Sequence, residues 1–245
     1  MKEVSLFVPY KNDSRFIFAQ EYLKDKFVLA KSAEEASVVL LPIPVKKSTA
    51  EAFCGKTMYA GCVSFDLPGE KIFDYGADEA FQRENAFLTA QGAFCLAGGA
   101  SQRAFFGADV LICGFGRIGS ALARLLCAAG ARVTVCSRSA ASQADCMFYG
   151  YSHINFSDLK SKLNYDFIFN TVPHPVFTDA ELKNVSPACI MTDLASFPGG
   201  IDVHSAASRN ITLLDGRAIP KRFSPQSAGI AVGKTVFRMI EEGNI

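Results

Sequence analysis

The first eighty residues alternate between short strand-like and helix-like patterns. Apolar and polar positions alternate over residues 4–8, which is typical of a half-buried strand, and a helical pattern follows at about 14–24. A continuous apolar run at 38–41 predicts a buried strand that two prolines close. Residues 46–69 have weak periodicity and predict no element. We therefore expect a small N-terminal α/β domain over residues 1–80.

A long apolar stretch with helical spacing then links the two halves of the chain. It runs from about 78 to 96, with Asp78 placed to cap the first turn and with Gly98 and Gly99 placed to end the helix. Because such a helix would join two domains, we place their boundary near residue 80. An equally open alternative is that the helix belongs wholly to the second domain.

The second half of the chain shows the regular succession of a parallel sheet. Strands are predicted at 108–113, 131–136, 166–170, 188–194 and 211–214, and helices at 118–129 and, at the end of the chain, 228–242. Strands that alternate with helices imply a parallel sheet covered on both faces. We expect an α/β protein in which a Rossmann-type doubly wound parallel sheet, over residues 81–245 with the terminal helix included, follows the smaller domain.

Composition and charge exclude some partners. Lys plus Arg is 25 against 24 for Asp plus Glu, so the chain as a whole has no net field to attract nucleic acid or an anionic membrane. The first ten residues lack the apolar core of a secretory signal, and no apolar run is long enough to span a membrane. We expect a cytoplasmic protein with no nucleic-acid or membrane partner.

Cysteine and histidine usage gives no sign of a metal site. The eight cysteines form no CxxC pair and several lie inside apolar runs, which is typical of reduced, buried thiols. His153, His174 and His204 are scattered without the spacing of a metal site or a catalytic triad. Prolines on both sides of His174 favour an exposed loop. We expect no bound metal, and no residue stands out as a catalytic acid or base.

A glycine pattern joins the first strand of the second half to its helix. The pattern fits GxGxxG, and its strand–loop–helix setting is the one that a dinucleotide-binding fingerprint requires. Gly114 would allow a tight turn, Gly116 would let backbone N–H groups approach a pyrophosphate, and Gly119 would let helix and strand pack closely. The expected cofactor-binding residues are Gly114, Phe115, Gly116, Arg117, Ile118 and Gly119. The alternative is a Rossmann-like fold that has lost its cofactor.

The end of the next strand bears on which nicotinamide cofactor is bound. NAD enzymes usually place an acidic residue there, against the ribose hydroxyls. This chain has Ser137, Arg138 and Ser139 instead, and two hydroxyls with a guanidinium can bind a 2′-phosphate by charge-assisted hydrogen bonds. We therefore predict NADP in preference to NAD, with a solvated, uninvolved Arg138 as the alternative.

Loops after the later strands should line the ligand crevice. Thr171, Val172 and Pro173 form a turn that either lies against the nicotinamide ribose or simply ends a strand. Asp193 is a carboxylate in an apolar run and therefore needs partners. We favour a role for Asp193 in holding neighbouring backbone amides over a role as an acid. The glycine pair that ends 195–200 would free the backbone for close approach to a ligand.

The second half resembles the family of dipicolinate synthase A subunits. The run DLASFPGGID at 193–202 is similar to that family's DLASxPGGxD. Supporting matches lie at 137–139, 170–173 and 224–229, with looser ones at 13–15 and 83–86. The resemblance covers residues 75–245 closely and 1–45 loosely. The N-terminal half is shorter than is usual for the family, so we expect a divergent member with an altered substrate pocket.

The resemblance implies a reaction and its partners. It implies oxidation of dihydrodipicolinate, a cyclic imine, to the aromatic diacid dipicolinate during spore formation, with a nicotinamide cofactor and a flavoprotein-like second subunit. We also expect a homo-oligomer. The two carboxylates of the substrate call for cationic or N–H-rich contacts. The substrate-binding residues expected on this basis are Arg15, Glu84, Asn85, Ser196, Pro198, Gly199 and Gly200. An exposed pair with Asp13 is the alternative for Arg15.

Two other functions stay open. A D-2-hydroxyacid dehydrogenase would share the fingerprint, but residues 195–200 offer no Arg and residues 216–223 offer no His for its catalytic set. The second is a non-catalytic nucleotide-binding subunit of a complex, which the lack of an evident proton-transfer residue leaves open.

Overall fold

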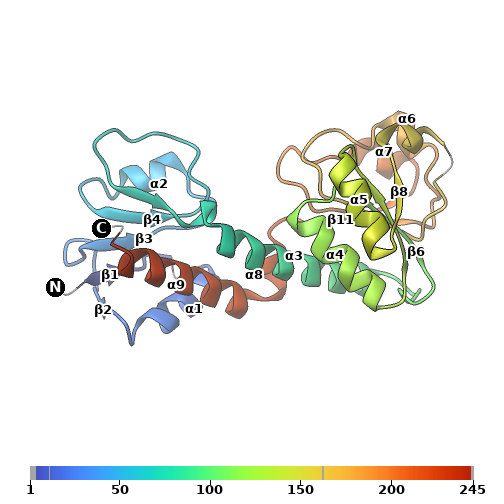
Figure 1. Cartoon of the computed structure of the whole chain (residues 1–245). Helices are drawn as coiled ribbons and strands as arrows, with labels where there is room; N and C mark the ends of the chain where they lie inside the picture. Colours follow the sequence, from blue (N-terminus) through green and yellow to red (C-terminus); the bar gives the residue numbers. More distant parts are fainter. Residues whose placement is uncertain (1–3, 11, 162, 244–245) are drawn as a thin grey trace. The chain divides into compact units, whose positions relative to one another are not determined.

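A computed structural model describes residues 4–10, 12–161 and 163–243, and divides the chain into two compact units. The first unit joins the residues up to Leu88 with those from Pro220 onward, and the second runs from Thr89 to Ile219. Figure 1 shows that each unit is built around its own sheet. The chain thus leaves the first unit once and returns to it for its final helix.

The first unit holds a five-stranded sheet whose strand pairs are all parallel, in the order β2-β1-β3-β4-β5. Its strands are β1 (Ser5–Phe7), β2 (Val28–Leu29), β3 (Val38–Leu40), β4 (Thr57–Ala60) and β5 (Ile72–Asp74). Its helices are α1 (Ser14–Leu23), α2 (Lys47–Glu51), the 3₁₀ turn η1 (Tyr75–Ala77), the first part of α3 (Glu79–Ala100) and α9 (Pro225–Glu241). The segment without predicted elements, 46–69, thus contains α2 and the buried strand β4.

The terminal helix belongs to this first unit, which corrects the predicted division of the chain. The sequence pattern predicts it in the domain at 81–245, but α9 packs along α1. A Cβ atom at Gly229 would lie 2.2 Å from the carbonyl oxygen of Arg15, so the two helix backbones touch. Val232, Val236 and Ile240 of α9 are buried with residues of the first sheet. Burial of this apolar stripe decides which unit the helix joins.

Helix α3 is capped as predicted but ends later than predicted. The Asp78 carboxylate accepts a hydrogen bond from the backbone N–H of Phe81 at 2.9 Å. The expected stop at Gly98 and Gly99 is wrong, because the helix continues to Ala100. Neither glycine takes a positive φ, and a Cβ at Gly98 would lie 3.1 Å from the Phe105 ring. Gly98 therefore serves side-chain packing instead of a helix stop.

The second unit confirms the predicted Rossmann-type doubly wound sheet. Six strands, all paired in parallel, follow the order β11-β10-β9-β6-β7-β8. They are β6 (Asp109–Cys113), β7 (Arg132–Cys136), β8 (Ser152–Ile154), β9 (Phe167–Asn170), β10 (Ile190–Asp193) and β11 (Thr212–Asp215). The strand order reverses between β6 and β9, and ligands of such sheets bind beyond the carboxyl ends of the strands at that point.

Helices cover both faces of this sheet (Figure 1). They are α4 (Arg117–Ala128), α5 (Ala140–Tyr149), η2 (Phe156–Lys160), α6 (Asp179–Leu182), α7 (Val203–Ser208) and the second part of α3. The short helix α8 (Ile219–Phe223) begins at the last residue of this unit. Successive residues of β6 enter different cores: Val110 and Ile112 pack in one cluster, Leu111 and Cys113 in the other. A strand buried on both faces needs a continuous apolar run, which is why the sequence predicted β6.

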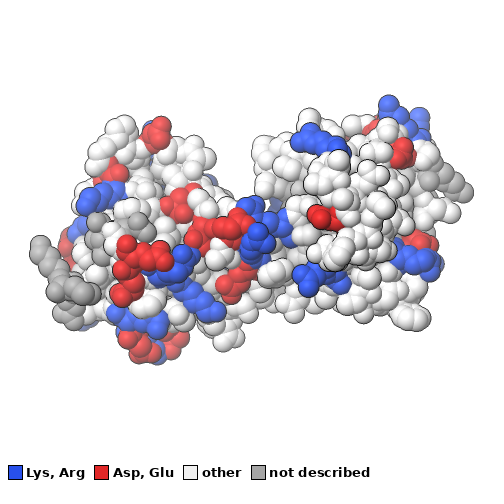
Figure 2. Space-filling view, in the orientation of Figure 1, with Lys and Arg blue, Asp and Glu red and all other residues white. Residues whose placement is uncertain are grey.

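The cysteine prediction is half right. Four thiols are buried, at Cys113, Cys136, Cys146 and Cys189, whereas those at Cys54, Cys62, Cys95 and Cys127 lie in exposed residues, and all eight are free. Among the described residues, no group of metal-ligating side chains comes together, and no helix has the length and apolar character to cross a membrane. On the face drawn in Figure 2, acidic and basic side chains occur in small mixed groups.

Candidate nucleotide-binding site

The junction between β6 and α4 is shaped by the absence of three side chains. Gly114 has φ +93°, and a Cβ there would lie 2.3 Å from Oγ1 of Thr171. A Cβ at Gly119 would lie 2.1 Å from the carbonyl oxygen of Gly114. A Cβ at Gly116 would meet no atom within 4 Å. Gly114 and Gly119 are thus required by the fold, whereas Gly116 faces open space that a ligand could fill.

The amino-terminal end of α4 is free of competing negative groups. Gly116 occupies the N-cap position and offers no side-chain cap, and the first turn contains no acidic residue. Leading N–H groups of a helix and the positive end of its dipole together favour an anion. This end of α4 is therefore suited to a pyrophosphate.

The junction between β7 and α5 is polar and cationic instead. The Ser139 side chain caps α5 by accepting a hydrogen bond from the backbone N–H of Ser142 at 3.3 Å. Arg138 is exposed, and no described carboxylate pairs with it. Ser137 is only 5% exposed, and its hydroxyl lies 2.9 Å from Nε2 of His153. We did not anticipate this contact, because sixteen positions separate the two residues in the sequence.

Both junctions open onto one cavity of about 670 Å³ in the second unit. Its lining consists of Gly114, Phe115, Gly116, Ser137, Arg138, Ser139, Ser142, Phe156, Leu159, Val172, Pro173, His174, Pro175, Val176 and Glu181. Eight of the predicted cofactor-binding residues therefore share one cavity. Its size and its mixture of apolar walls with a few polar groups are typical of a cofactor site.

Four predicted cofactor residues stay outside this lining. The hydroxyl of Thr171 donates to the carbonyl oxygen of Cys113 at 2.9 Å, which supports the turn beneath Gly114. Ile118 packs against the apolar core, and Gly119 is buried. Arg117 is exposed. Thr171, Ile118 and Gly119 build the junction, and direct contact with a cofactor stays a prediction for all four residues.

The sequence did not reveal the apolar wall of the cavity. Phe156 and Leu159 come from the short turn η2, which has no periodic pattern to announce it. His174, predicted to be exposed, is exposed at the rim between Pro173 and Pro175. Ser142 could have been noticed, because it lies three residues after the Ser139 cap and faces the same helix end.

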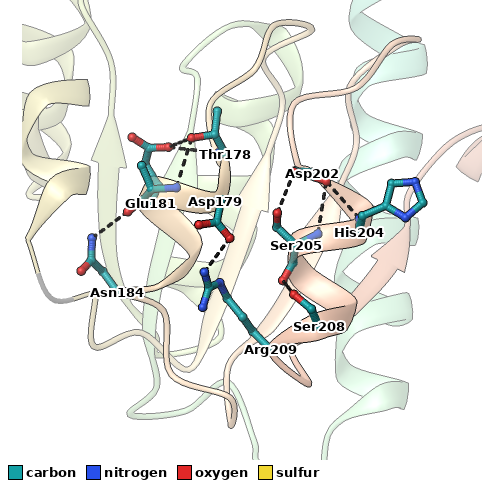
Figure 3. A network of polar contacts seen from close by, with 10 residues as sticks. Thr178, Asp179, Glu181, Asn184, Asp202, His204, Ser205, Ser208 and Arg209 are labelled. Carbon is teal, nitrogen blue, oxygen red and sulfur yellow. Dashed lines mark hydrogen bonds and ion pairs between the residues drawn. The ribbon is translucent and has the colours of Figure 1, made fainter.

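A network of polar contacts stabilises the helices α6 and α7 (Figure 3). The Glu181 carboxylate accepts hydrogen bonds from the backbone N–H and the hydroxyl of Thr178, the cap of α6. Arg209 pairs with Asp179, and Asp202 caps α7 through the N–H groups of the next turn. Glu181 is the one carboxylate that the described residues contribute to the cavity lining, and it is already engaged in a capping box.

The loop after β10 is held by Asp193, as favoured from the sequence. Its carboxylate accepts hydrogen bonds from Nδ2 of Asn170 at 2.8 Å and from the backbone N–H groups of Ala195 at 3.2 Å and Gly200 at 2.9 Å. Of the predicted substrate residues in this loop, Ser196 and Pro198 are exposed and Gly200 is buried. Pro198 and Gly199 line a second, smaller cavity of about 230 Å³ at the ends of β10 and β11.

Arg15 lies in the first unit, and its guanidinium is engaged. It forms two hydrogen bonds with the Asp13 carboxylate, at 2.8 and 3.1 Å, and a third with the carbonyl oxygen of Ile43. Lys221 lies 3.2 Å from the same carboxylate. Burial raises the pKa of Asp13, but hydrogen bonds and charge from Arg15 outweigh it and leave that pKa below its usual value. The alternative pair with Asp13 is thus present, in a largely buried form.

The other predicted substrate residues are divided between the units. Glu84 and Asn85 lie on the part of α3 in the first unit, where the Glu84 carboxylate is 3.9 Å from Nζ of Lys234. Residues 196–200 lie in the second unit. A common pocket for the substrate therefore stays a prediction.

Comparison with known proteins identifies the type of the second unit. Residues 81–191 match the family described as "D-isomer specific 2-hydroxyacid dehydrogenase, NAD binding domain". The A subunit of dipicolinate synthase from Bacillus subtilis (strain 168) is 30% identical over 159 residues, which cover 64% of this chain and 54% of that protein. The match thus spans about half the length of this curated relative.

Solved structures extend the likeness to both units. The dipicolinate synthase A subunit of Bacillus halodurans superposes with a TM-score of 0.86 at 21% identity, over 97% of each chain. Its counterpart from Bacillus subtilis gives 0.83 at 20% identity, over 99% of this chain and 97% of that one. D-lactate dehydrogenase of Escherichia coli gives 0.65 at 14% identity, over 98% and 97%. At these identities the superpositions show the fold, and together with the sequence match they confirm the predicted resemblance to the dipicolinate synthase A subunits. The second unit has the Rossmann-type fold of the 2-hydroxyacid dehydrogenase NAD-binding domain.

Proposed function

We propose that the chain is an oxidoreductase that uses NADP to oxidise dihydrodipicolinate to dipicolinate during spore formation. The observation that supports it most is the single cavity shared by the glycine junction and the Ser137 to Ser139 junction. The name of the curated relative supplies the substrate class. Oxidation removes a hydride and a proton from the ring, and the aromatic product makes this loss favourable.

The residues of the chain bind and orient in this proposal, while the nicotinamide supplies the redox chemistry. The α4 amino terminus beside Gly116 would hold the pyrophosphate. Arg138, with the hydroxyls at the β7–α5 junction, would hold the 2′-phosphate. Phe156 and Leu159 would give the adenosine an apolar wall. The rim residues Val172 and Pro173 follow the carboxyl end of β9, and the strand order reverses between β9 and β6.

The test mixes the purified chain, NADP and freshly generated dihydrodipicolinate, and follows dipicolinate by its ultraviolet absorbance. We expect product and reduced cofactor in equal amounts. The same mixture with a flavoprotein-like second subunit tests the proposed partner, and sedimentation tests the proposed homo-oligomer. Reduced cofactor without dipicolinate, on a 2-hydroxyacid substrate, would contradict the proposed substrate and favour a D-2-hydroxyacid dehydrogenase.

A non-catalytic nucleotide-binding subunit is the second candidate. It is favoured by the engagement of Glu181 in a capping box, which leaves the cavity lining without an uncommitted carboxylate among the described residues. Tight dinucleotide binding with no turnover, either alone or with the second subunit, would support this candidate over the enzyme.

A further inference from the structure

His153 lies directly behind the proposed 2′-phosphate site. It belongs to the edge strand β8, whose residues 152–154 pair in parallel with residues 134–136 of β7. Ser137 is the next residue after β7, and its backbone N–H donates to the carbonyl oxygen of Ile154 at 3.2 Å. This pairing places the His153 ring 2.9 Å from the Ser137 hydroxyl, measured from Nε2 to Oγ.

The state of this hydrogen bond decides what Ser137 can offer to a ligand. A serine hydroxyl has one hydrogen to donate and two lone pairs. If Nε2 carries a hydrogen, the ring donates to Oγ and the serine hydrogen stays free for a ligand. If Nε2 carries the lone pair, it takes the only hydrogen of Ser137. An anion in the cavity accepts hydrogen bonds and therefore favours the arrangement in which Nε2 carries the hydrogen and the Ser137 hydroxyl is free to donate.

The surroundings of Ser137 are those of an anion site. Ser137 lines the cavity beside Arg138, Ser139 and Ser142. Arg138 has no carboxylate partner among the described residues. Helix α5 begins at Ala140, and its first turn contains no acidic residue. The Arg138 guanidinium, the amino terminus of α5 and the hydroxyls of Ser139 and Ser142 therefore line the same part of the cavity. The Ser137 hydroxyl would add a further donor to an anion bound there.

We propose that His153 is a positioning residue for cofactor choice: its ring donates from Nε2 to Ser137 Oγ and so directs the Ser137 hydroxyl toward the 2′-phosphate that Arg138 binds. This inference rests on the proposed NADP preference. It assigns to His153 no contact with the cofactor. Its effect should therefore appear only with ligands that carry a 2′-phosphate.

The experiment compares two probes that differ in the 2′-phosphate alone, 2′,5′-ADP and 5′-AMP, by calorimetric titration of the full chain. His153→Phe removes the ring donor, and His153→Gln keeps an N–H at a similar reach. Loss of one hydrogen bond predicts about three- to tenfold weaker binding of 2′,5′-ADP by His153→Phe, with 5′-AMP unchanged. We expect His153→Gln to retain most of the affinity for 2′,5′-ADP.

Ser137→Ala is the matched variant on the other side of the bond. It should weaken 2′,5′-ADP binding to a similar extent, and the double variant should lose no more than either single one, because both variants act on the same hydrogen bond from the Ser137 hydroxyl to the 2′-phosphate. Ser137→Ala also decides the case if His153→Phe fails to fold, since an unchanged preference in Ser137→Ala would overturn the inference.

The outcomes separate this inference from the proposed function. Equal binding of the two probes by the unmodified chain would overturn the NADP preference itself. A preference for 2′,5′-ADP that is undiminished in His153→Phe would leave the NADP proposal standing and overturn the role of His153. An equal loss for both probes would show that His153 supports the fold only, which also overturns it.

Discussion

The two loop–helix junctions at the rim of the cavity do their work in opposite ways. After β6, three glycines remove side chains, so the backbone of residues 114–119 turns tightly and α4 starts without a side-chain cap. After β7, side chains dominate: Ser139 caps α5, Ser137 bonds to His153, and Arg138 faces the solvent. The first junction can bind what all dinucleotides share, and the second can read where they differ.

This comparison predicts that affinity and selectivity can be changed separately. Every nicotinamide dinucleotide has a pyrophosphate, so damage at the β6–α4 junction should weaken NADP and NAD alike. The two cofactors differ at the 2′ position, so damage at the β7–α5 junction should weaken NADP alone. Substitutions at four positions of the two junctions test this comparison.

Gly116→Asp should have the largest effect on binding. Its Cβ meets no atom within 4 Å, so the fold should tolerate it, but its carboxylate would face the pyrophosphate. Two like charges about 4 Å apart repel by about 4 kcal/mol near a protein surface, or roughly a thousandfold in affinity. Titration with NADP and NAD should show both losses, and Gly116→Ala is the control. Retained binding would mean that the pyrophosphate lies elsewhere.

Arg138→Gln should reverse the cofactor preference. Loss of a charge-assisted bond to the 2′-phosphate should cost about 1.5 to 3 kcal/mol of NADP binding, roughly ten- to a hundredfold. NAD affinity should change by less than about twofold, since NAD has no group for this guanidinium to bind. Dissociation constants for both cofactors check this. If the unmodified chain binds NAD as tightly as NADP, the assignment of Arg138 is wrong.

Gly119→Ala should act mainly on the stability of the fold and not on a contact with the ligand. The new Cβ would lie 2.1 Å from the backbone oxygen of Gly114, and neither backbone can yield easily. We expect the free energy of unfolding in urea to fall by about 1 to 3 kcal/mol. Gly116→Ala is again the control, and it should cost less than about 1 kcal/mol, because only the preference for glycine at an N-cap is lost. Equal costs at the two glycines would contradict the assignment of close helix–strand packing to Gly119.

Substitutions of Ser139 should have the smallest effects, and they should separate stability from NADP affinity. Ser139→Ala removes the cap on the Ser142 N–H and should lower the free energy of unfolding by about 1 kcal/mol. Ser139→Asp keeps a capping oxygen, so stability should stay near that of the unmodified chain while its charge weakens NADP binding and spares NAD. Urea unfolding and titration together check this. A cap-preserving Asp that leaves NADP affinity intact would place the 2′-phosphate away from α5.

Patterns local in the sequence predicted the elements that form the site. The continuous apolar run of β6 predicted a strand buried on both faces, and the GxGxxG pattern predicted the turn after it. Asp193 in an apolar run needed partners, and it holds the backbone of its own loop. These predictions succeeded because each depends on residues within a few positions of one another.

Predictions that depended on distant neighbours fared worse. Gly98 looked like a helix stop, but the Phe105 ring packs against it and α3 continues. The terminal helix looked like part of the second domain, yet its apolar stripe is buried against α1 and the first sheet. No periodic signal marked Phe156 and Leu159 as a cavity wall. In each case a tertiary contact outweighs the local preference.

The sequence by itself determined five of the six strands of the second unit, the glycine junction and the lack of an acidic residue after β7. These are properties of hydrophobic period, backbone freedom and charge, which each short segment carries with it. Only the tertiary structure decided that α9 joins the first unit, that Arg15 is engaged by Asp13, and that His153 bonds to Ser137. Those pairings depend on which surfaces become buried together, and sequence separation does not reveal that.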